Sequence, residues 1–569
     1  MDSKLVMLWD LMKEWGVDVF LLQHTDEYQS QDIHASKRRI EWLCGFSGSN
    51  AFIVVCPGEK GKFFTDSRYI VQSAVEVNQE YYQIYDMCKV SPVEWIKNNT
   101  AKDAIVGYDG ELFTLKQIRP YDGLRLKMLT GIALDMLWKR EISIVQRIVS
   151  HPVEFAGVSN QEKRQEVVKK ISGADAVLMT DVDAISWLLN IRNLNFLHNP
   201  SVLSRAILYK DGAVDLFVDD VEQVSICDKD IKVLNSAALP STLAAIDNIA
   251  VDAATVPMSI FFAINDRISV VMESDLCTIP KSVKNITEIK GAESAHIRDG
   301  VALVNFLHWL ESKIANEEVV TEIDAEIALL EFRKQQELFM GESFGSISAF
   351  GENAAIVHYR ATDSTNTVLK KGGIYLIDSG GQYLDGTTDV TRTIAIGAPT
   401  DEQIRNYTAV LKGHIALARA VFPRGTRGSA LDTLARQHLW RMHLQYGHST
   451  GHGVGSFLSV HEGPQAISAG NNVAILPGMI FSNEPGYYKE GEYGIRIENL
   501  MYAEECGDEF LRFKQLTCVP MDKRLMDITA LDAVEVEYIN GYHGLVRDAL
   551  GPRVSGEVRK WLYAACEDI

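Results

Sequence analysis

The spacing of hydrophobic and polar positions in the first 130 residues predicts alternating helices and strands. Leu5 to Trp15 has the period of an amphipathic helix, while Val17 to Leu22, Ala51 to Val55 and Lys62 to Phe64 are short apolar runs of strand length. A turn rich in glycine and serine, Gly45 to Ser49, comes before the last two strands. This alternation is typical of an α/β domain.

The same order of elements returns near residue 160. Helices are predicted over Glu162 to Ile171 and Asp183 to Leu189, and strands over Ala176 to Met179, Ala206 to Leu208 and Ala213 to Phe217. We therefore expect a second α/β domain of similar build, and a distant internal duplication would explain the repetition.

The pattern changes after residue 289. Amphipathic helices are predicted over Glu293 to Ile314 and Ile323 to Gln336, and short strands with glycine-rich turns follow, interrupted by helices around Asp401 to Val421 and Ala430 to Gln445. This mixture predicts an α+β domain in which helices pack on a curved antiparallel sheet. The tail beyond residue 510 ends in a helix from Gly556 to Ala565.

These patterns predict a division of the chain into four parts. Two α/β domains cover 1–150 and 151–288, an α+β domain covers 289–508, and a C-terminal extension covers 509–569. The length of 569 residues fits about three to four domains.

Composition narrows the partners and the compartment. A net charge of −20 argues against bulk binding to nucleic acid or to an anionic membrane, because phosphate contacts need clustered Lys and Arg. Charged residues interrupt the first apolar region, which favours an amphipathic helix over a signal peptide, and no apolar run reaches the length of about 18 residues that a membrane span needs. Cysteines are scattered without a CxxC pair, so we expect reduced, buried thiols and a cytoplasmic location. The eight cysteines are Cys44, Cys56, Cys88, Cys227, Cys277, Cys506, Cys518 and Cys566.

Candidate chemistry concentrates around a glycine-rich stretch from Gly447 to Gly455. It carries His448 and His452, and His461 follows shortly after. Small neighbours allow imidazole rings and backbone to approach a common point. Acidic residues that could complete a metal site lie before this stretch, at Asp378 and Asp389, and after it, at Glu484 and Glu498.

Two predicted hairpins bring the acids together. Asp378 ends the buried strand 374–377, and Asp389 lies on the returning strand 388–394, so both carboxylates reach the same end of the sheet. Strands 479–486 and 493–500 form the second hairpin.

Alternation along the last of these strands separates two kinds of side chain. Ile495 and Ile497 face the core, and Arg496 and Glu498 face the cleft. A single Asp or Glu at a strand end is usually a solvated surface group. Four carboxylates that converge with an imidazole would repel one another unless cations lie among them, and this oxygen-rich set suits two divalent ions such as Mn²⁺, with Zn²⁺ or Co²⁺ as alternatives.

These residues, taken in order, resemble the motifs of a known family. The order of the motifs in this chain is similar to that of the pita-bread metallopeptidases, family M24, and within them the long three-domain Xaa-Pro aminopeptidases (aminopeptidase P). The motifs are Asp378-Ser379-Gly380, Gly386 to Thr393, Gly451-His452-Gly453-Val454-Gly455, Asn483-Glu484-Pro485-Gly486 and Ile495-Arg496-Ile497-Glu498. Segments such as Thr65 to Tyr69, His198-Asn199-Pro200 and Tyr538 to His543 extend the resemblance over nearly the whole chain.

The resemblance implies two creatinase-like α/β domains followed by a pita-bread catalytic domain. It also implies that Asp378, Asp389, His452, Glu484 and Glu498 hold a pair of metal ions, usually Mn²⁺, with Asp378 and Asp389 on one of them. The implied activity is release of the N-terminal residue from peptides with proline in second position, Xaa-|-Pro-Yaa.

Further residues gain roles from the resemblance. His358, His448 and His461 would lie near the scissile bond. Arg68, from the first domain, would reach the substrate bound to the partner subunit in a homodimer. After His358 the sequence continues with Tyr359, Arg360 and Ala361, without the proline that follows this histidine in some members.

A mechanism can be set out as a hypothesis. The bond before proline has no N–H, and proline fixes φ, so a dedicated site is needed. A hydroxide held by the two metal ions would attack the carbonyl, with Glu484 as general base and with His461 and His358 as hydrogen-bond donors to the developing charge. Arg496, facing the substrate cleft, would orient the nearby carboxylates.

Two kinds of alternative stay open. One is another enzyme of the same fold: a prolidase that cuts only dipeptides, a methionine aminopeptidase, or a metal-independent creatinase. The other is a peptidase-like binding module without catalysis, as in certain histone chaperones, in which loss of metal ligands is expected. The three-part length disfavours the methionine enzyme, and the full set of five candidate ligands disfavours creatinase and the binding module.

Overall fold

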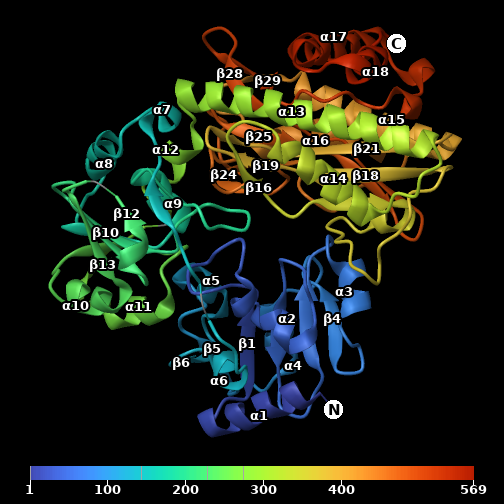
Figure 1. The fold of residues 1–569 in the computed structure, drawn as a ribbon. Helices are drawn as coiled ribbons and strands as arrows, with labels where there is room; N and C mark the ends of the chain where they lie inside the picture. The colour runs from blue at the N-terminus through green and yellow to red at the C-terminus, as the bar shows by residue number, and fades with distance from the viewer. Residues whose placement is uncertain (1, 143, 227, 273) are drawn as a thin grey trace. The chain divides into compact units, whose positions relative to one another are not determined.

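The computed structural model describes residues 2–142, 144–226, 228–272 and 274–569. The chain divides into two units (Figure 1). The first contains Met1–His151, Val158–Phe196 and Ser201–Cys277, and the second contains Pro152–Gly157, Leu197–Pro200 and Thr278–Ile569.

Two six-stranded sheets make up most of the first unit. The first sheet has the order β4-β3-β2-β1-β5-β6. Its strands are β1 (Val19–Gln23), β2 (Phe52–Val55), β3 (Gly61–Thr65), β4 (Tyr82–Asp86), β5 (Ile105–Asp109) and β6 (Arg125–Leu129). The second sheet has the order β13-β11-β10-β8-β14-β15. Its strands are β8 (Ala176–Met179), β10 (Arg205–Tyr209), β11 (Val214–Val218), β13 (Ile231–Asn235), β14 (Ile249–Asp252) and β15 (Ile268–Met272).

The two sheets share one topology. In the first sheet, β1 pairs antiparallel with β2 on one side and parallel with β5 on the other. In the second sheet, β8 pairs in the same way with β10 and β14. In each, the outermost pair on both sides is parallel. This agreement is what the repeated sequence pattern predicted, and the α/β build of both sheets is confirmed.

Helices cover these sheets and join their strands. Asp2 caps α1 by accepting the backbone N–H of Lys4, which fixes the start of the predicted first helix. The main helices of the unit are α1 (Ser3–Trp15), α2 (Arg39–Cys44), α3 (Ile70–Glu76), α4 (Pro92–Asn99), α8 (Asn160–Val168) and α9 (Val182–Leu188). A separate three-stranded sheet has the order β12-β7-β9. Its strands are β7 (Ile148–Ser150), β9 (Ile191–Asn193) and β12 (Val224–Ser225).

The second unit is antiparallel in every strand pairing that is described. Its sheets have the orders β16-β19-β20, β17-β18-β21, β22-β29-β28-β25-β23-β24 and β26-β27. The strands that carry the argument below are β17 (Ile347–Phe350), β18 (Gly373–Ser379), β19 (Gly381–Tyr383), β21 (Val390–Ile396), β23 (Gly451–Gly453), β24 (Glu462–Ile467), β25 (Ile480–Asn483), β26 (Gly486–Lys489), β27 (Tyr493–Arg496), β28 (Asn499–Glu505) and β29 (Phe510–Gln515). The remaining strands are β16 (Phe339–Glu342), β20 (Gly386–Thr387) and β22 (Val421–Pro423).

Helices pack on both faces of the β18–β21 pair. On one face, apolar side chains of α13 (Ile286–Ala315) and α14 (Glu322–Lys334) bury Tyr375 and Ile377. On the other, α15 (Asp401–Ala418) and the C-terminal α17 (Ala533–Leu550) and α18 (Gly556–Ala565) share a core with Ile374 and Ala395. Figure 1 shows α13 running the length of the unit beside α17 and α18. Strand β18, which carries Asp378, is therefore packed between helices on both faces.

Three sequence predictions need correction here. The long helix begins at Ile286, earlier than the predicted Glu293, because Asn285 and Glu288 form a capping box. The helix α16 (Gly428–Trp440) ends before the predicted Gln445, and His443 beyond it has a positive φ of 58°. The extension also contains α17, which was not predicted at all.

The cysteines are free thiols wherever they are described. Cys56, Cys277, Cys518 and Cys566 are buried as predicted, whereas Cys88 is exposed. Cys227 lies outside the described residues. None of the helices that the described residues form combines the length and apolar character that a membrane crossing needs.

Candidate metal centre

Asp378 and Asp389 meet at one end of the β18–β21 hairpin. Asp378 pairs with Thr391, and the last pair of the ladder joins Ser379 to Val390, so Asp389 follows directly beyond it. Oxygens of Asp378, Asp389 and Glu498 lie within 4.8 Å of one another, and all three side chains are buried. The predicted convergence of the first carboxylate pair is confirmed.

Glu484 and Glu498 lie where strands break, which corrects the single hairpin predicted for 479–500. The β25–β28 ladder stops at Asn483 and Asn499, and the β26–β27 ladder begins at Gly486 and Arg496. Pro485 has no N–H to continue a ladder, so the chain changes partners at this point.

The backbone at each break is held by another segment instead, the residue before β23 at Glu484 and strand β21 at Glu498. The N–H of Glu484 donates to the Thr450 carbonyl at 2.8 Å, and the N–H of Glu498 donates to the Thr391 carbonyl at 3.2 Å. The alternation predicted for the last strand is confirmed, because Ile495 and Ile497 are fully buried in the core while Arg496 reaches Asp378.

His452 projects from β23 toward the acids. Its Nε2 lies 3.4 Å from Asp389 Oδ2 and 3.5 Å from Glu484 Oε1. Its Nδ1 lies 2.9 Å from the Gly453 carbonyl, which can only accept, so Nδ1 carries a proton and Nε2 is the ring nitrogen that faces the carboxylates.

The close approach of β23 to β25 requires a glycine. A Cβ on Gly451 would lie 2.0 Å from the Ser482 carbonyl oxygen. Ser482 in turn accepts the N–H of His452 and donates to Glu484 at 3.2 Å. The small residues of this stretch thus permit the contact that the sequence pattern predicted.

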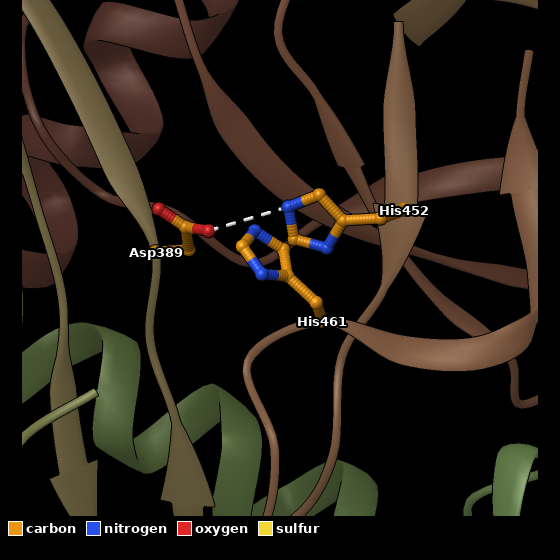
Figure 2. A group of neighbouring side chains, drawn as sticks. All are labelled: Asp389, His452 and His461. Atoms are coloured by element: carbon orange, nitrogen blue, oxygen red, sulfur yellow. Dashed lines mark ion pairs between the residues drawn. The ribbon is translucent and has the colours of Figure 1, made fainter. Parts of the chain in front are cut away.

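Figure 2 shows His461 beside His452 and Asp389. The two rings meet edge to face, with centroids 4.3 Å apart, and ligand atoms of His461, His452 and Asp389 lie within 4.8 Å of one another. His461 is exposed, unlike the acids behind it. It is the solvent-exposed member of this group of three residues.

Arg496 is the single cation in direct contact with the carboxylates among the described residues. Its guanidinium donates to Asp378 Oδ2 at 2.6 Å through Nη2, and to the Tyr488 hydroxyl at 2.7 Å through Nη1. Its Nε also lies 3.2 Å from Thr391 Oγ1, which donates to Glu498 at 2.7 Å. Arg496 is 2% exposed.

One guanidinium does not balance four carboxylates, and the pKa values reflect the deficit. Burial, together with Asp378 and Glu484, raises the pKa of Asp389 well above its ordinary range. Burial and Asp389 do the same to the pKa of Glu498. Burial and Glu498 raise the pKa of Glu484 to about 8.

The donor set fits divalent cations. The Oδ1 atoms of Asp378 and Asp389 are buried and have no hydrogen-bond partner among the described residues. Buried oxygens of this kind are costly unless something pairs with them. Carboxylates and one imidazole form a hard set suited to Mn²⁺, Zn²⁺ or Co²⁺. Bound cations would restore the charge balance and keep all four acids ionised.

His448 lies behind Glu484 and not among the ligand atoms that cluster around Asp389. Its Nε2 is 2.9 Å from the Tyr488 hydroxyl, and its Nδ1 is 3.9 Å from Glu484 Oε2. Tyr488 therefore links His448 to Arg496. The sequence motifs did not single out Tyr488, and only its position on the hairpin next to Glu484 could have suggested a role.

His358 is half-buried in the turn after the short helix η6 (Gly351–Ala355). This helix packs against β27, where a Cβ on Gly494 would lie 1.7 Å from the Ala354 carbonyl oxygen. The buried Glu322 holds the loop, accepting from the hydroxyl of Tyr359 at 3.0 Å and from the N–H of Thr367 at 2.9 Å. Sequence reasoning missed Glu322, because a carboxylate in a helical pattern looks like a surface group.

Arg68 belongs to the first unit, on the turn between β3 and α3. It forms a bidentate pair with Asp66, at 2.8 and 2.7 Å, and its side chain is 32% exposed. Its expected contact with substrate stays a prediction.

Family models match the chain in four consecutive segments. Two models of a creatinase/prolidase N-terminal domain match residues 5–129 and 140–288. Metallopeptidase family M24 matches residues 290–505, and the C-terminal region of peptidase M24 matches 509–569.

Curated relatives cover the whole chain. A probable Xaa-Pro aminopeptidase P of Blastomyces gilchristii is 35% identical over 99% of this chain and 98% of its own length. That of Laccaria bicolor is 34% identical over 100% of this chain and 93% of its own. Among solved structures, an X-prolyl aminopeptidase from Caenorhabditis elegans, described as a cytosolic enzyme with a di-nuclear active site, matches with a TM-score of 0.93. It is 31% identical, and the match covers 100% of this chain and 99% of the other.

Proposed function

The chain belongs to the long Xaa-Pro aminopeptidases of metallopeptidase family M24, a class of metal-dependent aminopeptidases, and from this premise we propose that it cleaves the bond before a proline in second position, Xaa-|-Pro-Yaa. Peptides with a free N-terminus and a penultimate proline are the proposed substrates. Two Mn²⁺ ions are the proposed cofactors, with Zn²⁺ or Co²⁺ as alternatives.

One observation carries the proposal. Four carboxylates and His452 converge on a space where Arg496 is the single neighbouring guanidinium, and two of the buried oxygens lack a hydrogen-bond partner among the described residues. We propose Asp378, Asp389, His452, Glu484 and Glu498 as the ligands of a cation pair.

Bound cations would supply a hydroxide nucleophile at neutral pH and Lewis-acid polarisation of the scissile carbonyl. The chain's own groups would do the rest. Glu484, at the open side of the cluster with 17% of its side chain exposed, would take the proton of the attacking water and pass it to the proline nitrogen. That nitrogen is a tertiary amide and accepts the proton only as its bond to the carbonyl carbon breaks.

Neighbouring side chains would position the substrate. His461 stands exposed beside His452, where its ring can donate to the carbonyl oxygen, and we propose the same role for His358. His448, held by its hydrogen bond to Tyr488, would steady the neighbouring Glu484. We propose that Arg496 acts mainly by holding Asp378, because its burial leaves little room for substrate.

Several features of the proposal reach beyond the cluster. A homodimer in which Arg68 serves the partner's substrate is proposed from the family alone. A cytoplasmic location is proposed from the scattered cysteines and from a first apolar region that does not resemble a signal peptide. The division at residues 150, 288 and 508 into two N-terminal domains, a catalytic domain and an extension is likewise proposed.

A set of matched peptides tests the function. The protein, stripped with a chelator and then reloaded with Mn²⁺, should release the first residue from Xaa-Pro-Yaa and only weakly from Xaa-Ala-Yaa, and the stripped protein should do neither. Cleavage of the dipeptide Xaa-Pro with no cleavage of the tripeptide would indicate a prolidase. Bound Mn²⁺ with no hydrolysis of any of these peptides would contradict the proposed function.

A further inference from the structure

The C-terminal extension reaches the metal centre through one buried side chain, Arg392. Arg392 lies on β21, three residues after Asp389, is 2% exposed, and points away from the carboxylate cluster. Its Nη1 donates to the backbone carbonyls of Thr391, at 2.9 Å, and Glu498, at 2.6 Å.

The rest of the guanidinium binds the extension and the strand that enters it. Nε donates to the Pro520 carbonyl at 3.1 Å, and Nη2 donates to the Val519 carbonyl at 2.7 Å and to the Tyr542 hydroxyl at 2.9 Å. Nη2 also reaches Asn499 Oδ1 at 2.8 Å. Tyr542 lies on α17 and itself donates to the Val519 carbonyl at 2.8 Å.

The hydrogen bond from Arg392 to Glu498 replaces strand pairing at that residue. Glu498 falls in the gap between the β26–β27 and β25–β28 ladders, so regular strand pairing does not fix its carbonyl. That carbonyl is fixed by Arg392, and the carboxylate of the same residue is fixed by Thr391 Oγ1, the neighbour of Arg392 in sequence.

Packing does not replace these hydrogen bonds. A cavity of about 260 Å³ borders Arg392 between α13, β21, the segment 520–524 and α18. Because side chains next to a cavity gain little from close contact on that side, the guanidinium depends on its polar partners.

We propose that Arg392 is a positioning residue through which the C-terminal extension, by way of Val519, Pro520 and Tyr542, holds Glu498 in place to bind a divalent cation. The extension is thereby a part of the metal centre and not only a cover for helix α13. The inference rests on the proposed function, since it takes Glu498 to be a metal ligand.

Tyr542→Phe is the mildest variant that weakens the connection, because the bonds from Arg392 to the Pro520 and Val519 carbonyls are kept. It removes one hydroxyl that accepts from Arg392 and donates to Val519. Tyr538→Phe is its matched control, because Tyr538 lies one turn earlier on α17, stacks on Tyr542 with ring planes 4° apart, and has a buried hydroxyl that makes no hydrogen bond among the described residues. Arg392→Lys replaces the five N–H donors of the planar guanidinium, which reach partners through three nitrogens, by three donors on a single nitrogen, and is the stronger variant.

The readout is Mn²⁺ affinity of the metal-free protein, measured by titration with detection of free Mn²⁺. Tyr542→Phe should weaken one of the two binding steps by about 3- to 10-fold, and Arg392→Lys by up to about 100-fold, the range seen when the partners of metal ligands are removed. Turnover in both variants should recover as Mn²⁺ is raised. Tyr538→Phe should bind Mn²⁺ as the wild type does.

The failures are distinguishable. If Tyr542→Phe is folded by circular dichroism and binds Mn²⁺ with wild-type affinity, the inference is wrong, even if its thermal stability has dropped. Should Arg392→Lys fail to fold, Tyr542→Phe decides alone. If the wild-type protein itself binds no Mn²⁺, the proposed function fails, and this inference fails with it.

Discussion

Ion-paired buried acids and the acids of the metal centre, both in the second unit, differ in how their charge is balanced. Asp299 on α13 is paired bidentately with Arg333, at 2.8 and 3.1 Å, and also accepts from the hydroxyl of Tyr383. Glu462 lies between the ammonium groups of Lys281 and Lys284. Each of these carboxylates has at least one cation of its own from the chain.

The cluster around Asp389 is different. Its four carboxylates share Arg496, and the sequence places no second Lys or Arg in contact with them among the described residues. The same fold that supplies a cation for Asp299 and Glu462 thus leaves this cluster short of positive charge. The comparison teaches that an unbalanced acid cluster, and not buried acid as such, marks the place for an external cation.

The largest expected effect comes from changing the acid that would move the proton. Glu484→Gln should lower kcat on an Xaa-Pro-Yaa peptide by about 10³-fold, because a positioned general base contributes roughly 10²- to 10⁴-fold. Part of the metal should stay bound, as metal analysis of the same sample can show. Glu492→Gln, on the exposed turn of the neighbouring hairpin, is the control and should change kcat little. Wild-type turnover in Glu484→Gln would contradict the assignment.

Breaking the ion pair between Arg333 and Asp299 should destabilise the protein equally with and without metal. Arg333→Met would strand the buried carboxylate of Asp299, which should lower the free energy of unfolding by about 3–5 kcal/mol. Denaturant titrations with and without Mn²⁺ should give the same loss. Arg424→Met, which removes an exposed partner of Glu505, should cost less than about 1 kcal/mol. If Mn²⁺ restored the stability that Arg333→Met loses, the proposed distinction between the ion-paired acid and the metal-binding cluster would be wrong.

Neutralising one acid of the unbalanced cluster should change the stability of the protein in opposite directions without and with Mn²⁺. Asp389→Asn removes one of the repelling charges, so the metal-free variant should be as stable as the metal-free wild type or more stable by about 1 kcal/mol. In excess Mn²⁺ the order should reverse, because the wild type gains stability from binding and the variant gains less. Thermal unfolding of the four samples tests this. A variant that is less stable in both states would show that Asp389 serves packing instead.

The last expected effect is a pH dependence of the stability of the metal-free protein. The pKa of Glu484 rises from an ordinary 4.5 to about 8 on folding, chiefly through burial, so the folded state binds more protons than the unfolded state between these values. Stability from this group is therefore complete below about pH 4.5 and is lost as the pH rises toward 8. The difference in Tm between Mn²⁺-loaded and metal-free protein should widen from pH 5 to pH 8.

The same measurement on Glu484→Gln serves as the control for this dependence. Without the titrating carboxylate, the metal-free variant should lose less stability over that range than the metal-free wild type. An equal slope in both proteins would assign the pH dependence to other groups.

Local patterns predicted the elements and most of the cluster. The strand that ends at Asp378, the return toward Asp389 and the alternation that separates Ile495 from Arg496 all depend on neighbours in sequence, and the structure confirms them. The start of the long helix was predicted too late, at Glu293, although Asn285 and Glu288 have the spacing of a capping box.

Contacts among three segments could not be read from the sequence. The break at Glu484 and Glu498 depends on hydrogen bonds to Thr450 and Thr391, which lie far away in the chain. The hydrogen bonds of Arg392 likewise depend on backbone carbonyls of the C-terminal extension. A buried acid such as Glu322 has the same local pattern as a solvated one, and only the fold tells them apart.

The metal content of the wild-type protein tests the central claim most directly. Protein loaded with Mn²⁺, freed of unbound ions by gel filtration and analysed by atomic emission should carry about two Mn²⁺ per chain. That number should fall when Asp389 is replaced by Asn and stay unchanged when Arg333 is replaced by Met. A wild-type protein that leaves the column without divalent cations would contradict the account.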